Sequence, residues 1–152
     1  MSTAALPAGD LYLVVGYDGS DPARRALDAA VGLLHGRAGR IEVVFVSHVP
    51  NVGIVSAAAL AEIEVTFDEV GQELRTEVGE RLRGLEGRWG FEHRQGVIAD
   101  QLIAVAKDIR DAHAGDGVVI VAGSSSHARH RVVGSVAVSL ARHSPVPLVI
   151  VP

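Results

Sequence analysis

Two short polar loops, each following a run of apolar residues, carry the residues of this chain that could bind an anion. The later run, at 118–122, ends at Gly123 and passes into three serines, and a Gly-Ser pair follows at Gly134 and Ser135. An apolar run that stops at glycine is typical of a strand, and a Gly-Ser pair ahead of Val136 is typical of a helix start. Backbone N–H groups and the helix dipole both favour phosphate at such a junction.

A junction of the same kind lies near the start of the chain, where the apolar run 11–15 leads into Tyr17 and Asp18. The Asp18 carboxylate could accept hydrogen bonds from a ligand, or it could close a local turn between strand and helix. Ser47 and Val49 share one face near the end of another apolar run, where they could wall a binding pocket or belong to the core. If the two junctions face each other, they enclose one binding site.

Four basic residues lie between the two glycines of the later junction, namely His127, Arg129, His130 and Arg131. They could hold phosphate by charge-assisted hydrogen bonds, form a basic patch for a polyanionic partner, or keep the segment in water. A metal site is not expected here, because neither cysteine nor carboxylate accompanies the histidines. The segment 125–133 is polar and has few apolar anchors, so it should be mobile without ligand and become ordered when an anion binds.

Strand and helix signals that would position these loops alternate along the chain. The sequence predicts strands at 11–16, 41–49, 91–95, 118–122 and 147–151, and helices at 22–34, 56–85, 99–112 and 134–143. Asp21 is the expected N-cap of the first helix, with Pro22 at its first position. Alternation of this kind is typical of a parallel sheet covered by helices on both faces.

The character of the strands predicts their places in that sheet. The apolar strands at 11–15 and 118–121 fit adjacent central positions, whereas the polar strand at 91–95 fits an edge. In open sheets of this class the ligand crevice lies beyond the carboxyl ends of the strands, where the strand order reverses. The two polar loops are therefore expected to meet across that crevice.

Length and composition restrict the classes of protein that remain. A chain of 152 residues, 48% of them apolar, is expected to form one domain, at 10–152, after a flexible tail at 1–9. A net charge of −4 argues against a general nucleic-acid binder. The lack of cysteine excludes disulfides and thiol chemistry and suits a cytoplasmic protein, and no apolar stretch approaches the roughly 20 residues that span a bilayer.

Motifs that would indicate other chemistry are missing from the sequence. There is no Gly-x-x-x-x-Gly-Lys-[Ser/Thr] of a P-loop nucleotidase, no Gly-x-Ser-x-Gly nucleophile elbow and no Gly-x-Gly-x-x-Gly dinucleotide loop. No residue reads as a dedicated general base or nucleophile. The chain is therefore not expected to be an enzyme, and any ATP hydrolysis should be slow and incidental.

Residues 14–20, 121–124, 134–136 and 143–151 together resemble the universal stress protein family, in the order in which that family carries these motifs. The resemblance implies an α/β fold with an open, parallel five-stranded sheet of order 3-2-1-4-5 and helices on both faces, Rossmann-like and similar to the adenine nucleotide alpha hydrolases. It implies a homodimer joined along the edge strand 147–151. For one branch of the family it also implies bound ATP or a related adenine nucleotide, with magnesium.

That branch carries Gly-x-x-Gly, nine further residues and then Gly-Ser or Gly-Thr. Here Gly123 stands at the first glycine and Ser126 at the second, and the gap from Ser126 to Gly134 is two residues shorter. Serine costs roughly 1 kcal/mol more than glycine in a left-handed conformation, although its hydroxyl can itself bond phosphate. Carried over to this chain, the resemblance implies a nucleotide site made of Tyr17, Asp18, Ser47, Val49, Gly123, Ser124, Ser126, Arg129, Gly134, Ser135 and Val136.

Three hypotheses for the function follow. The first is a stress-response protein that binds an adenine nucleotide as a regulatory ligand. The second is a dimeric protein-interaction module that has lost nucleotide binding through its altered segment between Gly123 and Ser135. The third is an enzyme that uses the same crevice for adenylyl chemistry, for which the sequence offers no catalytic set. Neither a nucleic-acid partner nor a membrane partner is expected.

Overall fold

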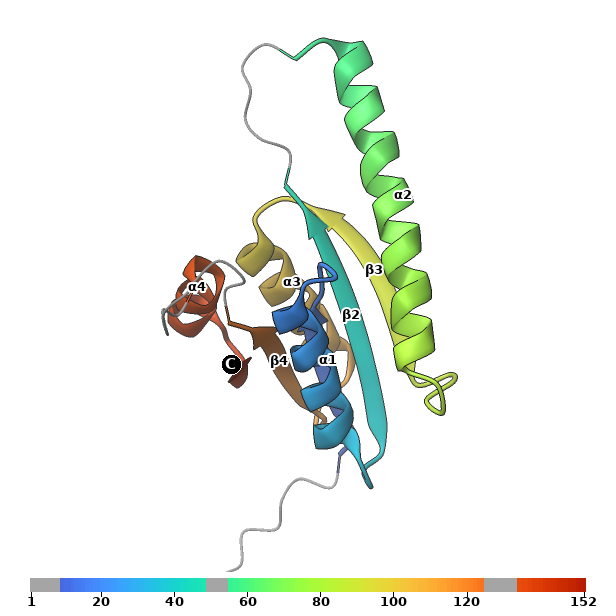
Figure 1. Ribbon diagram of the computed structural model, residues 1–152. Helices are drawn as coiled ribbons and strands as arrows, with labels where there is room; N and C mark the ends of the chain where they lie inside the picture. Colours follow the sequence, from blue (N-terminus) through green and yellow to red (C-terminus); the bar gives the residue numbers. More distant parts are fainter. Residues whose placement is uncertain (1–8, 49–54, 125–133) are drawn as a thin grey trace, which may run out of the picture.

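The computed structural model describes residues 9–48, 55–124 and 134–152. Strands and helices alternate along these residues (Figure 1). The strands are β1 (Leu11–Gly16), β2 (Gly39–Ser47), β3 (Trp89–Gln95), β4 (Gly117–Gly123) and β5 (Leu148–Val151). The helices are α1 (Asp21–Leu34), α2 (Ala57–Arg81), α3 (Ile98–Ala112) and α4 (Ser135–His143).

The five strands form one parallel sheet in the order β3-β2-β1-β4-β5, which confirms the predicted α/β fold. β1 lies between β2 and β4, with Val14 opposite both Glu42 and Ile120. Its residues Leu13 and Val14 are fully buried, as expected of a central strand that is covered on both faces. The polar β3 lies at one edge, also as predicted.

Helices cover both faces of the sheet and divide the core in two. On one face α1 and α2 pack against the alternate residues of β1 and β2 that include Leu13 and Val43. On the other face α3 and α4 pack against the intervening residues, among them Val14 and Val44. The core is therefore built almost entirely from valine, leucine, isoleucine and alanine, as the composition predicted.

The observed ends of several elements differ from the predicted ones. The N-cap of α1 is Ser20 and not Asp21, because the Ser20 hydroxyl accepts a hydrogen bond from the Ala23 amide at 3.3 Å. Both residue types cap helices well, and proline fits the second helical position as well as the first. α2 ends at Arg81, four residues early, and β3 begins at Trp89, two residues early.

Some predictions concern residues outside the described part of the chain. These include most of the tail predicted at 1–9, of which only Gly9 is described, and Val49 at the predicted end of the second strand. They also include the segment 125–133, whose predicted mobility stays a prediction.

Candidate functional site

A cavity of about 320 Å³ opens at the carboxyl edge of the sheet, where the neighbouring strands β1 and β4 lead to helices on opposite faces. The loop after β1, the end of β4 and the last part of β2 form its walls on the side of the sheet, and the N-terminal parts of α1, α3 and α4 form the rest. It is lined by Gly16, Tyr17, Asp18, Ser20, Pro22, Ala23, Val44, Val46, Ile98, Leu102, Ala122, Gly123, Ser124, Gly134, Ser135, Val136 and Ala137. The two polar junctions therefore do meet across one crevice.

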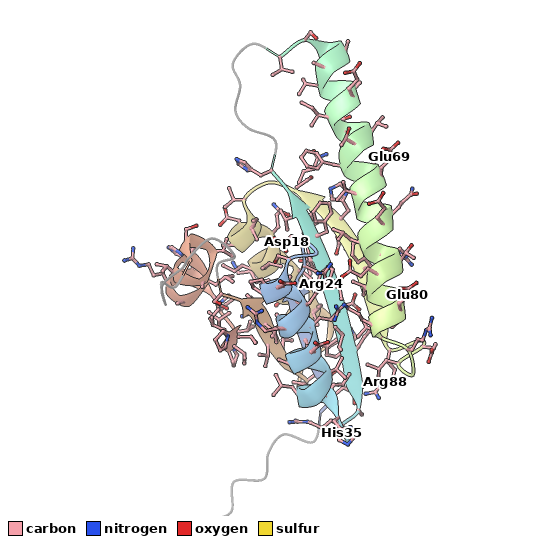
Figure 2. The ribbon with its side chains drawn as sticks, viewed as in Figure 1. Asp18, Arg24, His35, Glu69, Glu80 and Arg88 are labelled. Carbon is pink, nitrogen blue, oxygen red and sulfur yellow. The ribbon has the colours of Figure 1, made fainter. Side chains whose placement is uncertain are left out.

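Asp18 closes the turn that leads into α1 and also borders the cavity. Its Oδ1 atom accepts a hydrogen bond from the Ser20 amide at 2.9 Å, which is an Asx turn. The side chain is exposed at the end of the β1–α1 loop, as Figure 2 shows. The local role that the sequence allowed for Asp18 is thus observed, and the residue also lines the cavity.

The N-terminus of α4 presents to the cavity backbone donors that have no acceptor among the described residues. Its N-cap is Gly134, with φ −64° and ψ 162°, and it has no side-chain cap. The amides of Ser135, Val136 and Ala137 lie in the first turn, where no intrahelical acceptor exists, and all three residues line the cavity. These donors and the helix dipole favour an anion at this wall.

Gly123 is required by packing. A Cβ atom at this position would lie 2.7 Å from the Cβ of Pro22 and even closer to the Pro22 carbonyl, because α1 crosses the end of β4 there. The φ of Gly123 is not in the left-handed region. The neighbouring Ser124 amide donates to the Val151 carbonyl at 2.8 Å, so this N–H is already used within the sheet. The Ser124 hydroxyl belongs to the cavity lining and could meet a ligand.

One wall of the cavity is apolar and was not predicted from the sequence. Val44 and Val46 of β2 face Ile98 and Leu102 of α3 across it, with Ala122 of β4 beside them. Because β2 is buried on both faces, its apolar residues show no alternation that would reveal which ones face the cavity. The spacing of Ile98 and Leu102 on one helix face was the available signal, and it indicates burial without indicating a ligand.

Ser47 lies on the opposite face of β2 from this wall. Its hydroxyl is 2.8 Å from Nε2 of His93, whose Nδ1 is 3.5 Å from the Asp68 carboxylate of α2. This is the residue order of a catalytic triad, but Ser47 is only 2% exposed and gives a substrate no access. The three side chains instead connect α2 to the sheet, and Ser47 does not line the cavity.

Tyr17 borders the cavity, while its phenol extends away from it and donates to Glu77 of α2. Nε of Arg24 also donates to Glu77, at 2.7 Å, and Arg81 lies 3.5 Å from the same carboxylate. Hydrogen bonds from Arg24 and Tyr17 lower the pKa of Glu77 to about 2. Burial, and then Glu77, raise the pKa of Tyr17 to about 12. Glu77 thereby connects Tyr17 of the cavity wall to α1 and α2, the two helices on this side of the sheet.

The cavity thus brings together seven of the predicted site residues, which are Tyr17, Asp18, Gly123, Ser124, Gly134, Ser135 and Val136. Three others, Val49, Ser126 and Arg129, lie outside the described residues. Their roles, like that of Ser47, stay predictions.

Within the described ranges, no three histidine or acidic side chains gather in a way that could hold a metal ion. The same ranges contain no helix both long and apolar enough to cross a membrane.

Comparison with known proteins identifies the family. A model of the universal stress protein family matches residues 13–152. No curated protein matches the chain. Among solved structures, universal stress protein UspA from Lactobacillus plantarum is similar with a TM-score of 0.76 at 18% identity, over 95% of this chain and 99% of that one.

Two further solved structures are described with a bound nucleotide. A universal stress protein in complex with cAMP has a TM-score of 0.62 and 20% identity, over 93% of this chain and 97% of that one. A family protein from Arabidopsis thaliana with AMP bound has a TM-score of 0.56 and 10% identity, over 93% and 90%. The family match, which extends over nearly the whole described fold, carries the conclusion that this chain belongs to the universal stress protein family.

Proposed function

We propose that this protein binds an adenine nucleotide, ATP or a relative of it, in the cavity between β1 and β4 as a regulatory ligand. The single observation that carries the proposal is the combination of an apolar wall with an uncapped helix N-terminus in one cavity. Ligand pockets typically pair an apolar surface with a few convergent polar groups. Two similar structures, one with cAMP and one with AMP bound, support the choice of adenine nucleotides.

The two ends of the cavity favour one orientation of the ligand. Val44, Val46 and Leu102 offer an apolar surface that suits a planar base. The amides of Ser135 and Val136 at the start of α4 suit the phosphates. With ATP, magnesium would accompany the phosphates.

The proposal assigns binding and not turnover. Among the described lining residues, Asp18 is the only charged side chain, and it already accepts the Ser20 amide. The Asp18 carboxylate keeps further lone pairs, but no second carboxylate, histidine or lysine among the described lining residues could complete an acid–base pair with it. Any hydrolysis of ATP should therefore be slow and incidental.

A calorimetric titration tests the binding proposal. AMP, cAMP and ATP with magnesium are titrated into the purified protein and into the Asp18→Ala, Gly134→Val double variant. We expect the double variant to lose most of the affinity, because the added valine side chain stands where α4 must meet the ligand. A Val138→Ser variant, altered at an exposed residue of the same helix, serves as the control.

Unchanged binding by the double variant would remove this cavity as the site. No binding at millimolar concentrations of all three nucleotides would instead favour the second candidate, an interaction module without nucleotide. That candidate rests on one sequence observation, the serine at position 126 and the short gap that follows it.

We also propose that the domain, at 10–152, forms a cytoplasmic homodimer along β5. β5 is an edge strand within the described sheet, and its four residues Leu148 to Val151 are all apolar and all only half-buried. Pairing with the same strand of a second copy would satisfy the edge and bury these side chains. Val149→Lys should shift the mass measured by light scattering toward the monomer, and an unchanged dimer would put the interface elsewhere.

A further inference from the structure

The N-terminal part of α2 extends beyond the sheet that its C-terminal part covers (Figure 1). Gly79 lies against Trp89 and Gly71 against His93, so the helix runs antiparallel to β3 with a fixed register. The eight residues from Gly71 to Gly79 span about 12 Å along the helix, and the four residues from Trp89 to His93 span about 13 Å along the strand. The two lengths agree, as this register requires. The two remaining residues of β3 reach only to about Phe67 of the helix. The first ten residues of α2 therefore have none of the described strands beneath them.

The apolar stripe that buries the C-terminal part of α2 continues along this extension. Four residues on one face of the helix are spaced by three, four and three positions and are here called the overhang surface: Leu60 and Ile63 on the extension, Phe67 where the strand beneath the helix ends, and Val70 beside the sheet. Phe67 also packs partly against the core. Leu74, four residues further along the same face, is buried in the core. Leu60 is 39% exposed and Val70 36%. This spacing is the one by which a helix packs against another helix.

The charges around the overhang surface all have one sign. Between residues 57 and 74 the chain carries five acidic residues and neither lysine nor arginine. Glu64 and Glu73 flank the apolar stripe on its two sides and are exposed. Of these acids, only Asp68 contacts a basic side chain among the described residues, with Oδ1 3.5 Å from Nδ1 of His93. Glu64 and Glu73 therefore form an acidic border along the stripe, to which a positively charged partner could bind.

We propose that the overhang surface docks an amphipathic helix of a partner protein whose apolar stripe is flanked by lysine or arginine. A second copy of this chain fits less well, because its own overhang would bring only acidic side chains against Glu64 and Glu73. An anionic lipid surface meets the same repulsion. The opposite charge on a basic helix removes this repulsion and speeds the encounter.

The probe is a fluorescein-labelled amphipathic peptide of leucine and lysine, about 18 residues long, with leucines at the two seam positions of each heptad. Its binding to the full chain is followed by fluorescence anisotropy at low and at moderate salt. An otherwise identical peptide with glutamate in place of lysine is the matched probe. We expect saturable binding of the lysine peptide that weakens with salt, and at least about tenfold weaker binding of the glutamate peptide.

Three variants locate the binding. Leu60→Ser with Ile63→Ser removes part of the apolar stripe and should weaken the lysine peptide about tenfold. Glu64→Lys with Glu73→Lys keeps the apolar stripe but reverses the charge of its border, and it should lower the affinity for the lysine peptide by a similar factor. Val65→Ser is the control, because Val65 is 57% exposed on another face of the same helix, and it should change the affinity less than twofold.

Several outcomes would overturn the proposal. They are the absence of saturable binding below about 100 µM, equal affinity for the two peptides, or equal loss in the Val65→Ser control. Should the serine double variant fold poorly by circular dichroism, the charge-reversal variant decides alone, since both of its positions are exposed. A fall in oligomer mass by light scattering in the serine variant would make a second copy the occupant. None of these results depends on nucleotide binding.

Discussion

Replacing Glu77 by glutamine removes the negative charge that joins α1 and α2. In Figure 2 Arg24 of α1 lies on the side of the helix that faces α2, and its Nε atom donates to Glu77 at 2.7 Å. Tyr17 donates to the same carboxylate and Arg81 lies 3.5 Å from it. Glutamine can still accept from Tyr17, but it no longer offsets the charge of the two arginines.

The magnitude follows from the lowered pKa of Glu77. A fall from 4.5 to about 2 corresponds to roughly 3.4 kcal/mol if fully realised. The side chains of Arg24 and Glu77 are 36% and 29% exposed, so solvent screening reduces this to about 1–2 kcal/mol. Because the folded pKa is the lower one, this stability is fully present above pH 4.5. It is lost as the pH falls from 4.5 toward 2.

Urea unfolding followed by circular dichroism measures the effect at pH 7, 5, 4 and 3. We expect the wild type to exceed Glu77→Gln by about 1–2 kcal/mol at pH 7, with more than half of that difference gone by pH 3. Glu80→Gln is the matched control, because Glu80 is exposed on the same helix (Figure 2) and has no ion pair with a described residue. A difference that is constant with pH, or one that Glu80→Gln reproduces, would refute the reasoning.

Three further predictions concern the elements around the cavity. Gly123→Ala should lower the free energy of unfolding by about 1–3 kcal/mol in urea titrations, because its methyl group meets Pro22, whereas Gly32→Ala, which has open space around it, should not destabilise. Ser20→Ala should cost about 1 kcal/mol by the same measurement, through loss of the α1 cap, and a cost near zero would contradict that role. Neutralising Arg129 and Arg131 should remove most of the salt dependence of ATP affinity in calorimetry. An unaltered salt dependence would indicate that backbone N–H groups, and not these arginines, bind the phosphates.

Much of the fold could be predicted from the sequence because each element has a strong local signal. The uninterrupted apolar residues of β1 and β4 indicated central, adjacent strands, and the structure pairs Leu13 with Val119. The polar residues of β3 indicated an edge. The full strand order rested on the family resemblance, since no local pattern distinguishes the positions of β2 and β5.

The candidate site could be predicted in its polar half only. Asp18, Gly134 and Ser135 follow or precede elements with clear ends, and helix starts have recognisable residue types. The apolar half could not be predicted because β2 is buried on both faces. Ser47 was predicted as a possible wall of the pocket. Its hydroxyl instead contacts His93 on the α2 side of the sheet, and the neighbouring Val46 lines the cavity. Which face of a doubly buried strand meets a ligand depends on the packing of other elements.

The position of Pro22 against Gly123 bears on how sequences of related proteins are compared. The glycine is needed wherever a helix crosses the end of the fourth strand this closely, with or without a ligand. We therefore expect this glycine as often in homologues that do not bind nucleotides as in those that do. Its presence is a poor criterion for sorting an alignment into binding and non-binding branches. The residue at 126 and the length of the segment before Gly134 should discriminate better, because these are the two sequence features in which this chain departs from the nucleotide-binding pattern.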